Sequence, residues 1–243
     1  MSKLSRRLAL AALALVAGRA SAVVTVTPDV QVGPGGAGST FTPSYVVSAT
    51  DLINGKAPTA SAGDFSVELS GGLPVLTDGV YGTITEPGGA PDRTHGAFGV
   101  AGGGTGTGSS VTYALGTNPA GYNISSIVSY GGWNDNGRDQ QAYTVAYSTV
   151  ASPGTFIDLA TVSYNPTVGA SLQTANRVTI VDDTLPNLAT GAAAVRFTFN
   201  PATENGYSGY AELDVIGTPT PEPGAATVVF ATAGALLARR RRL

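Results

Sequence analysis

The chain has 243 residues, with 33 glycines, 15 prolines and only 12% charged residues. Cysteine is absent and there is one histidine, His95, which excludes disulfide scaffolds, thiolate zinc sites and multi-histidine metal centres. Between residues 23 and 218 there are five basic and 15 acidic residues, a net charge of −10. A body with this charge repels phosphate backbones, so we expect no nucleic-acid partner.

Residues 1–22 have the organisation of a secretory signal peptide. Three basic residues precede an apolar run at residues 8–18, and Ala20 and Ala22 flank Ser21 in a small-x-small cleavage site. The apolar run is shorter than the about 20 residues that span a bilayer. We therefore expect export through the secretory translocon. The alternative is a buried N-terminal helix.

Residues 23–217 predict one all-β domain. Short β-branched runs are separated by Gly, Pro, Asn and Asp, and no long stretch has a convincing helical period. This pattern favours a two-sheet antiparallel sandwich of jelly-roll type. The predicted strands are residues 23–27, 45–50, 65–69, 111–115, 124–130, 142–148, 156–164, 177–181, 194–199 and 209–216.

From Leu76 onward the order of features resembles the galactose-binding-like, discoidin-type (F5/8 type C) sandwich, over a core of about residues 73–217. The segments that carry the resemblance are Leu76-Thr77-Asp78-Gly79 and residues 111–115, 122–127, 141–148, 194–199 and 210–217. The tryptophan that usually follows the Asp-Gly turn is missing here. Residues 23–72 add N-terminal strands that the minimal fold does not need.

The resemblance implies a structural calcium ion where the Asp-Gly turn meets the last strand. Asp78 and Glu212 would be its carboxylate ligands, with Asp214 as a further candidate. Calcium takes six to eight oxygen ligands, which turn carbonyls and two acidic side chains can begin to supply. The alternative is a solvated turn aspartate and an edge-strand glutamate.

A loop between two predicted strands carries the residue types that bind sugars. Trp133 offers an aromatic face, and Asn134, Asn136 and Arg138, together with His95, offer hydrogen-bonding groups. We predict a carbohydrate site from these residues. The alternative is that Trp133 is a partly buried anchor, Asn136 begins a tight turn and Arg138 pairs with a neighbouring aspartate.

The sequence offers little support for catalysis. Asp182 and Asp183 are adjacent, so on a strand they would point to opposite faces and could not act as a paired acid and base. They precede Thr184 and predict a turn. No Gly-x-Ser-x-Gly nucleophile motif is present. We therefore expect a protein that is not an enzyme.

The C-terminal end has three parts in a fixed order. A linker at residues 218–223 ends in Pro221, Glu222 and Pro223, the uncharged residues 224–238 follow, and residues 239–243 form a basic tail. Fifteen helical residues reach about 22 Å, which is short of the ~30 Å hydrocarbon core and predicts a weak transmembrane anchor. The tail arginines, which should stay cytoplasmic, are Arg239, Arg240, Arg241 and Arg242.

This end resembles the PEP-CTERM sorting signal of bacteria that make extracellular polysaccharide. The resemblance implies an exosortase, a membrane-embedded protease, as a partner that cleaves near Pro221-Glu222-Pro223. The protein would be anchored transiently in the inner membrane and then reach the cell surface or the extracellular space. A plain C-terminal anchor is the alternative.

Three functions follow from these features. The first is an exported surface or matrix protein whose sandwich binds polysaccharide. The second is a structural or adhesive matrix protein without a ligand site. The third is a secreted polysaccharide-active hydrolase or lyase, which requires an open cleft with two carboxylates about 5–10 Å apart.

Overall fold

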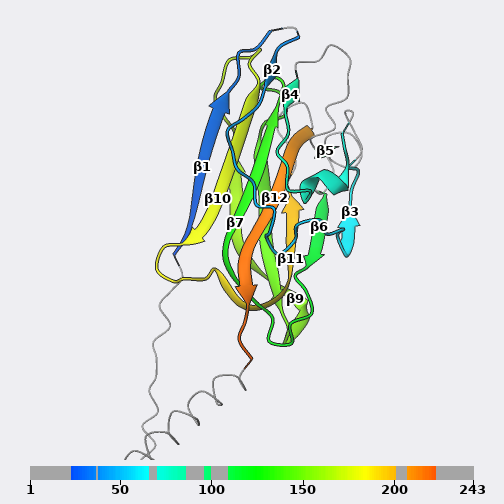
Figure 1. Ribbon diagram of the computed structural model, residues 1–243, viewed down its shortest axis with the longest axis vertical. Coiled ribbons are helices and arrows are strands. Elements are labelled where there is room, and N and C mark those ends of the chain that lie inside the picture. Colours follow the sequence, from blue (N-terminus) through cyan, green and yellow to red (C-terminus); the bar gives the residue numbers. More distant parts are fainter. Residues whose placement is uncertain are drawn as a thin grey trace, which may run out of the picture.

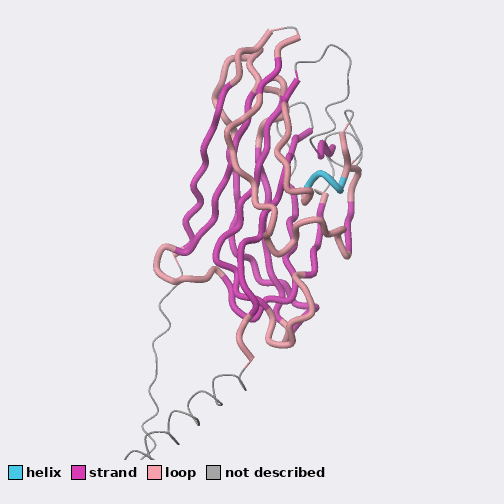
Figure 2. The backbone as a smooth tube through the Cα atoms, in the orientation of Figure 1, coloured by secondary structure: helices cyan, strands magenta, loops and turns pink. Residues whose placement is uncertain are grey.

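The structure is a computed structural model that describes residues 23–36, 38–65, 70–85, 96–99, 109–200 and 207–222. Strands dominate this part of the chain, and its single helix is the short 3-10 turn η1 (Figure 2). The elements are β1 (Val24–Val32), β2 (Thr40–Phe41), β3 (Ala60–Ala62), η1 (Leu73–Leu76), β4 (Ile84–Thr85), β5 (Gly96–Gly99), β6 (Ser110–Ala114), β7 (Tyr122–Trp133), β8 (Gln141–Thr149), β9 (Ser152–Tyr164), β10 (Thr174–Asp182), β11 (Ala189–Phe199) and β12 (Tyr207–Pro219).

Ten strands form one continuous hydrogen-bonded sheet that folds over into two layers (Figure 1). The front layer has the strand order β1-β10-β7-β12-β5, and the rear layer has the order β9-β8-β11-β6-β3. Every described pairing is antiparallel. The predicted all-β antiparallel sandwich is confirmed.

Strand β11 joins the two layers. Ala189 and Ala192 pair with the start of β7 in the front layer, whereas β11 pairs with β8 from Ala192 onward and with β6 from Ala194 onward in the rear layer. The register with β7 shifts between Ala189 and Ala192, where Gly191 lies with a φ of 64°. A strand that changes layers at a bulge makes a corner of the sandwich, and glycine adopts this backbone conformation without a Cβ clash.

The main core fills the space between the layers. Alternate residues of the strands point inward, so that Tyr143 and Phe197 of the rear layer meet Tyr210 of the front layer. The rings of Phe199 and Tyr210 are 4.9 Å apart, centroid to centroid. Each fully buried apolar side chain contributes about 1.5–3 kcal/mol, so this cluster stabilises the fold without any disulfide.

A strap of irregular chain, residues 42–53, covers the outer face of the front layer and crosses in front of β7 and β12 (Figure 1). Tyr45 of the strap packs with Tyr130 of β7 in a second apolar cluster, and the Tyr130 hydroxyl donates to the Val46 carbonyl over 3.1 Å. The prediction of a strand at residues 45–50 is wrong. In place of a ladder, one of its backbone N–H groups, that of Ser48, donates to the Asp214 side chain.

The N-terminal residues are integral to the sandwich. Strand β1 extends beyond the predicted residues 23–27 and pairs with β10 along its whole length. The Leu52 N–H donates to the Val215 carbonyl over 2.8 Å, which ties the end of the strap to β12. Residues 23–72 therefore supply the edge strand β1 and a cover for the outer face of the front layer.

Both ends of the body leave the sandwich at the same end (Figure 1). The Val23 carbonyl accepts a hydrogen bond from Asp183, and the Thr220 N–H donates to Gly121, just before β7. Trp133 closes the opposite end of β7. Strand β12 continues to Pro219, so the first two residues of the expected linker are paired with β7.

The targeting segments fall largely outside the described residues. These include the signal peptide with Ala20 and Ala22, the span at residues 224–238, and Pro223 with the arginines at 239–242. Pro221 and Glu222 are described and exposed. Within the described ranges, no helix has the length and apolar character needed to cross a membrane.

Candidate functional site

Strand β12 places two acidic side chains on the outer face of the front layer. Leu213 and Val215 point into the main core, so the residues alternating with them, Glu212 and Asp214, point the other way. Both acids are nonetheless buried, with 0% and 1% of their surface exposed, because the strap lies over this face. A carboxylate in such a place is costly unless it is protonated or paired.

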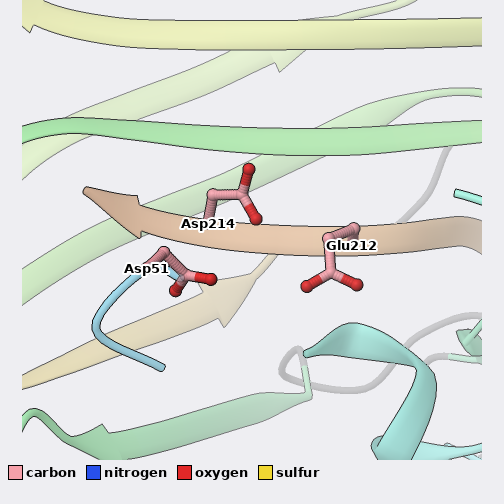
Figure 3. A group of neighbouring side chains, drawn as sticks. All are labelled: Asp51, Glu212 and Asp214. Atoms are coloured by element: carbon pink, nitrogen blue, oxygen red, sulfur yellow. The ribbon is translucent and has the colours of Figure 1, made fainter. Parts of the chain in front are cut away.

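The strap brings a third carboxylate, that of Asp51, to the same point. Asp51 Oδ1 accepts hydrogen bonds from the N–H of Ile53 over 2.8 Å and of Val215 over 3.2 Å, which fixes the side chain against β12. One carboxylate oxygen each from Asp51, Glu212 and Asp214 lies within 4.8 Å of the others. Figure 3 shows Asp51 on its loop facing the two side chains of β12.

Each carboxylate of this cluster uses one oxygen and leaves the other without a partner. Glu212 Oε2 accepts from the Gly79 N–H over 3.1 Å, and Asp214 Oδ2 accepts from the Ser48 N–H over 2.9 Å. The second oxygens, Asp51 Oδ2, Glu212 Oε1 and Asp214 Oδ1, are buried and have no hydrogen-bond partner. Three unsatisfied acceptors in one dry place call for a cation or for protons.

The electrostatics show how strongly the cluster resists carrying its full negative charge. Burial, and then the charges of Asp214 and Asp78, raise the pKa of Glu212 to about 10. Burial raises the pKa of Asp214 to about 6, and it also raises the pKa of Asp51. In the absence of a cation, Glu212 therefore holds a proton at neutral pH, which a bound cation would displace.

The donor set fits a hard cation. It consists of carboxylate oxygens, which calcium and magnesium prefer, and it contains none of the nitrogen or sulfur ligands typical of zinc. Calcium completes a shell of six to eight oxygens with backbone carbonyls and water, and it tolerates irregular geometry better than magnesium does. Asp51, Glu212 and Asp214 would hold such an ion, and it would clamp the strap to the last strand.

The structure places both predicted residues, Asp78 and Glu212, at this site, but they contribute to it in different ways. The Asp-Gly turn approaches Glu212 through the Gly79 N–H, while the Asp78 side chain is exposed and its Oδ1 accepts from the Val80 N–H over 2.9 Å. Asp78 does not belong to the three-carboxylate group. A side chain on Gly79 would be strained, because its φ is 76° and a Cβ would lie 2.8 Å from Asn54 Nδ2.

Sequence reasoning missed Asp51 altogether. It lies in the region that appeared additional to the fold, and no motif surrounds it. Only the path of the strap over β12 brings it to Glu212. A hydrogen bond to a partner 164 positions away in the chain cannot be predicted from local spacing.

The Trp133 loop, residues 133–140, shapes the far end of the sandwich. Trp133 is 6% exposed, and the Arg138 guanidinium lies 5.4 Å from the centre of its ring, a cation–π contact. Asn136 lies in a turn in which the Gly137 N–H donates to Asp135 Oδ1 over 2.7 Å. The ring face that would meet a sugar is thus occupied by Arg138 in this conformation.

The other predicted ligand residues of this loop are placed as follows. Asn134 Oδ1 is buried without a hydrogen-bond partner, and His95 lies outside the described residues. Buried hydrogen bonds hold the end of the loop in place. Asn176 Nδ2 donates to the Asp139 carbonyl over 2.7 Å, and the Gln141 side chain bonds both Asn176 and Ser129. This buried polar network was not predicted.

A pocket of about 650 Å³ lies beside the Asp-Gly turn, lined by residues that include Lys56, Leu73 and Asp78. Lys56 Nζ donates to the carbonyls of Ala114 and Leu115 over 3.3 and 2.6 Å, so its charge is already engaged. The Trp133 loop contributes nothing to this pocket. The pocket and the predicted sugar site are therefore separate features.

The acidic cluster does not face an open cleft in the ranges described. Two of its three acids, Glu212 and Asp214, are buried under the strap, where a substrate would not reach them. Asp182 closes the turn predicted for it, since its Oδ1 accepts from the N–H groups of Thr184 and Leu185 over 2.8 and 2.9 Å.

Neither protein-family models nor curated proteins match the sequence. Solved structures to which the chain is similar include the module "CpGH89CBM32-5" of Clostridium perfringens in complex with GalNAc-β-1,3-galactose, at 16% identity and a TM-score of 0.38, covering 65% of this chain and 92% of that one. The family 32 carbohydrate-binding module (CBM) of C. perfringens NanJ, in complex with galactose, has 16% identity and a TM-score of 0.39, with coverages of 64% and 90%.

A third similar structure is the CBM32 of AlyQ in complex with 4,5-unsaturated mannuronic acid, at 14% identity and a TM-score of 0.36, covering 66% of this chain and 95% of that one. These identities and TM-scores are low. The described body is an all-β antiparallel sandwich, as its own strand pairings establish.

Proposed function

We propose that this chain is an exported, non-catalytic carbohydrate-binding protein whose sandwich is locked by calcium. The calcium site is supported by the cluster of Asp51, Glu212 and Asp214, whose unpartnered oxygens converge in a buried place. A divalent cation there satisfies three acceptors at once and joins the strap to β12. The cation has a structural role, and ligand binding belongs to the far end of the sandwich.

Calcium in this site agrees with a protein that works outside the cell. Calcium sites of extracellular modules have Kd values of about 10⁻⁴–10⁻³ M, so they fill only where calcium is abundant. The cost of burying the carboxylates of Glu212 and Asp214 would also lower the affinity of this site for calcium. The ion would thus bind after export, and the strap would be locked at the cell surface.

The positions of the two ends support tethering with the Trp133 loop directed outward. The chain enters at Val23 and leaves at Thr220 on one end of the sandwich, and Trp133 lies at the other. The translocon would export the chain, the C-terminal span would hold it, and an exosortase would cleave near Pro221-Glu222-Pro223. Replacing these three residues by alanines should leave the tail uncleaved by mass spectrometry; unchanged processing contradicts sorting by this motif.

The ligand would bind at the Trp133 loop after Arg138 moves off the ring. Arg138, Asn134, Asn136 and His95 would then bond sugar hydroxyls while Trp133 packs against the sugar ring. The test is retention of the full chain on a broad glycan array with calcium present. Trp133→Ala should lower retention at least tenfold, and Asn136→Ala, which changes a half-buried side chain in the turn of the loop, should lower it with little change in Tm. If both variants are retained as strongly as wild type, the Trp133 loop is not the carbohydrate site.

One observation favours a second function, that of a structural or adhesive matrix protein without a ligand site. Trp133 is 6% exposed and lies under Arg138, as an anchor of the loop would. This alternative predicts that the wild-type chain is not retained on any glycan and that Trp133→Ala lowers Tm alone.

A further inference from the structure

The two layers differ in how their outer faces are used. The strap covers the front layer, whereas the outer face of the rear layer carries a row of small hydroxyl side chains. Cross-strand pairing places Ser110, Thr198, Thr144 and Thr161 side by side on four neighbouring strands, and the Oγ1 atoms of Thr144 and Thr161 are 3.2 Å apart. With strands about 4.8 Å apart, the row is about 14 Å long.

Arg196 lies in the next row of this face. It pairs with Thr112 on one side and Ala146 on the other, yet its guanidinium carbon is 4.1 Å from the centre of the Phe156 ring on β9. The side chain must therefore run flat across β8. Ala146 and Ser148, which face outward on β8, are 3% and 0% exposed, in keeping with a side chain lying over them.

Arg196 differs from Arg177 and Lys56 in having no oxygen partner among the described residues. Arg177 forms an ion pair with Asp29 at 3.1 Å, and Lys56 bonds two carbonyls. No hydrogen bond or ion pair of Arg196 occurs among the described residues, and its Nε is buried without a partner. The strands of the rear layer carry one other charged residue, Asp158.

We propose that this face binds a carboxylate-bearing polysaccharide, with Arg196 as the anchor of the carboxylate and the hydroxyl row along the sugar chain. The inference rests on the proposed carbohydrate-binding function but assigns it a second surface and an acidic ligand. A guanidinium binds a carboxylate through two parallel N–H···O bonds. Stacking on Phe156 already orders the side chain, so binding loses less conformational entropy.

The rest of the face suits an extended sugar polymer. The hydroxyls of Thr144, Thr161 and Thr198 both donate and accept hydrogen bonds, as sugar hydroxyls require. The body as a whole is acidic, with a net charge of −10 between residues 23 and 218. At physiological salt the Debye length is about 8 Å, so the charges nearest to a ligand on this face are those of Arg196 and of Asp158, which pairs with Ala146 in the same row and ends it on β9.

The test compares polygalacturonate with its fully methyl-esterified form, which differs in charge but little in shape. We expect the full chain to bind polygalacturonate in calorimetry at fixed ionic strength and to bind the ester at least tenfold more weakly. Arg196→Gln should lower the affinity for polygalacturonate at least tenfold. Arg177→Gln is the matched control, because it removes the same charge from the other layer, and it should leave the affinity unchanged.

A further variant separates binding from folding. Thr198→Val keeps the shape of the side chain, so it should weaken binding several-fold with an unchanged Tm. Equal binding of the acid and its ester, or equal effects of Arg196→Gln and Arg177→Gln, would overturn the proposal. If neutral glycans bind through Trp133 and polygalacturonate does not bind, the proposed function stands and this inference falls. Polygalacturonate binding that Trp133→Ala leaves intact supports the rear face and not the loop.

Discussion

Glu212→Gln should make the protein more stable than wild type without calcium and less stable than wild type with calcium. With a pKa of about 10 in the folded protein, Glu212 stays protonated at pH 7, whereas in the unfolded chain it ionises around its ordinary value of 4.5. The folded state then binds more protons than the unfolded one, which lowers the free energy of unfolding as pH rises from about 4.5 to about 10. At pH 7 the cost is about 3 kcal/mol.

Glutamine has the shape of the protonated acid and no such cost. Its carbonyl can still accept from the Gly79 N–H, and its amide group can donate to a neighbouring carboxylate oxygen. Without calcium, the variant should therefore be more stable than wild type at pH 7, by up to about 3 kcal/mol. The difference in stability between the variant and wild type should disappear below pH 4, where Glu212 is protonated in both the folded and the unfolded state of wild type.

Calcium should change the order of the two proteins. Wild type gains about 4 kcal/mol at a calcium concentration of 1,000 times Kd, and the variant, with one anionic ligand fewer, gains much less. Urea unfolding of the full chain with EGTA and with calcium measures both effects, and Asp158→Asn is the control that should respond as wild type does. A variant that is less stable than wild type by the same amount in both conditions would refute a cation site and leave a purely structural hydrogen bond.

Three further predictions concern the carboxylate cluster, the corner of β11 and the edge strand β1. Calcium affinity should rise steeply as pH passes about 6, where Asp214 loses its proton. Calcium binding should also release protons in an unbuffered titration. Calcium binding that does not depend on pH would argue against these ligands. Gly191→Ala forces a side chain into a left-handed conformation at the corner of β11 and should cost about 1–2 kcal/mol in urea unfolding, whereas no loss would show that the corner relaxes. Hydrogen bonds at both ends of β1 show that the N–H groups of its even-numbered residues point to the free edge of the sheet. Pro28 has no N–H group and so removes one donor from this edge. Pro28→Thr should therefore increase self-association in sedimentation, and a monomeric variant would contradict a protective role of Pro28.

Local chemistry determined much of what the sequence could predict. The alternation in residues 142–148 and 194–199 corresponds to β8 and β11, because side chains on a strand alternate between faces over a few residues. The Asp-Gly turn and the turn at Asn136 follow from backbone preferences of the same short range. These elements were predictable without knowledge of their partners.

Tertiary structure decided everything that depends on two distant segments. The predicted strand at residues 45–50 became a strap, because its polar groups bond β12 and β7 in place of a neighbouring strand. The same path carries Asp51 to Glu212, and the register of β8, β9 and β11 brings Arg196 over Phe156. Such meetings follow from which strands pair and in which register, and these long-range choices leave no local pattern in the sequence.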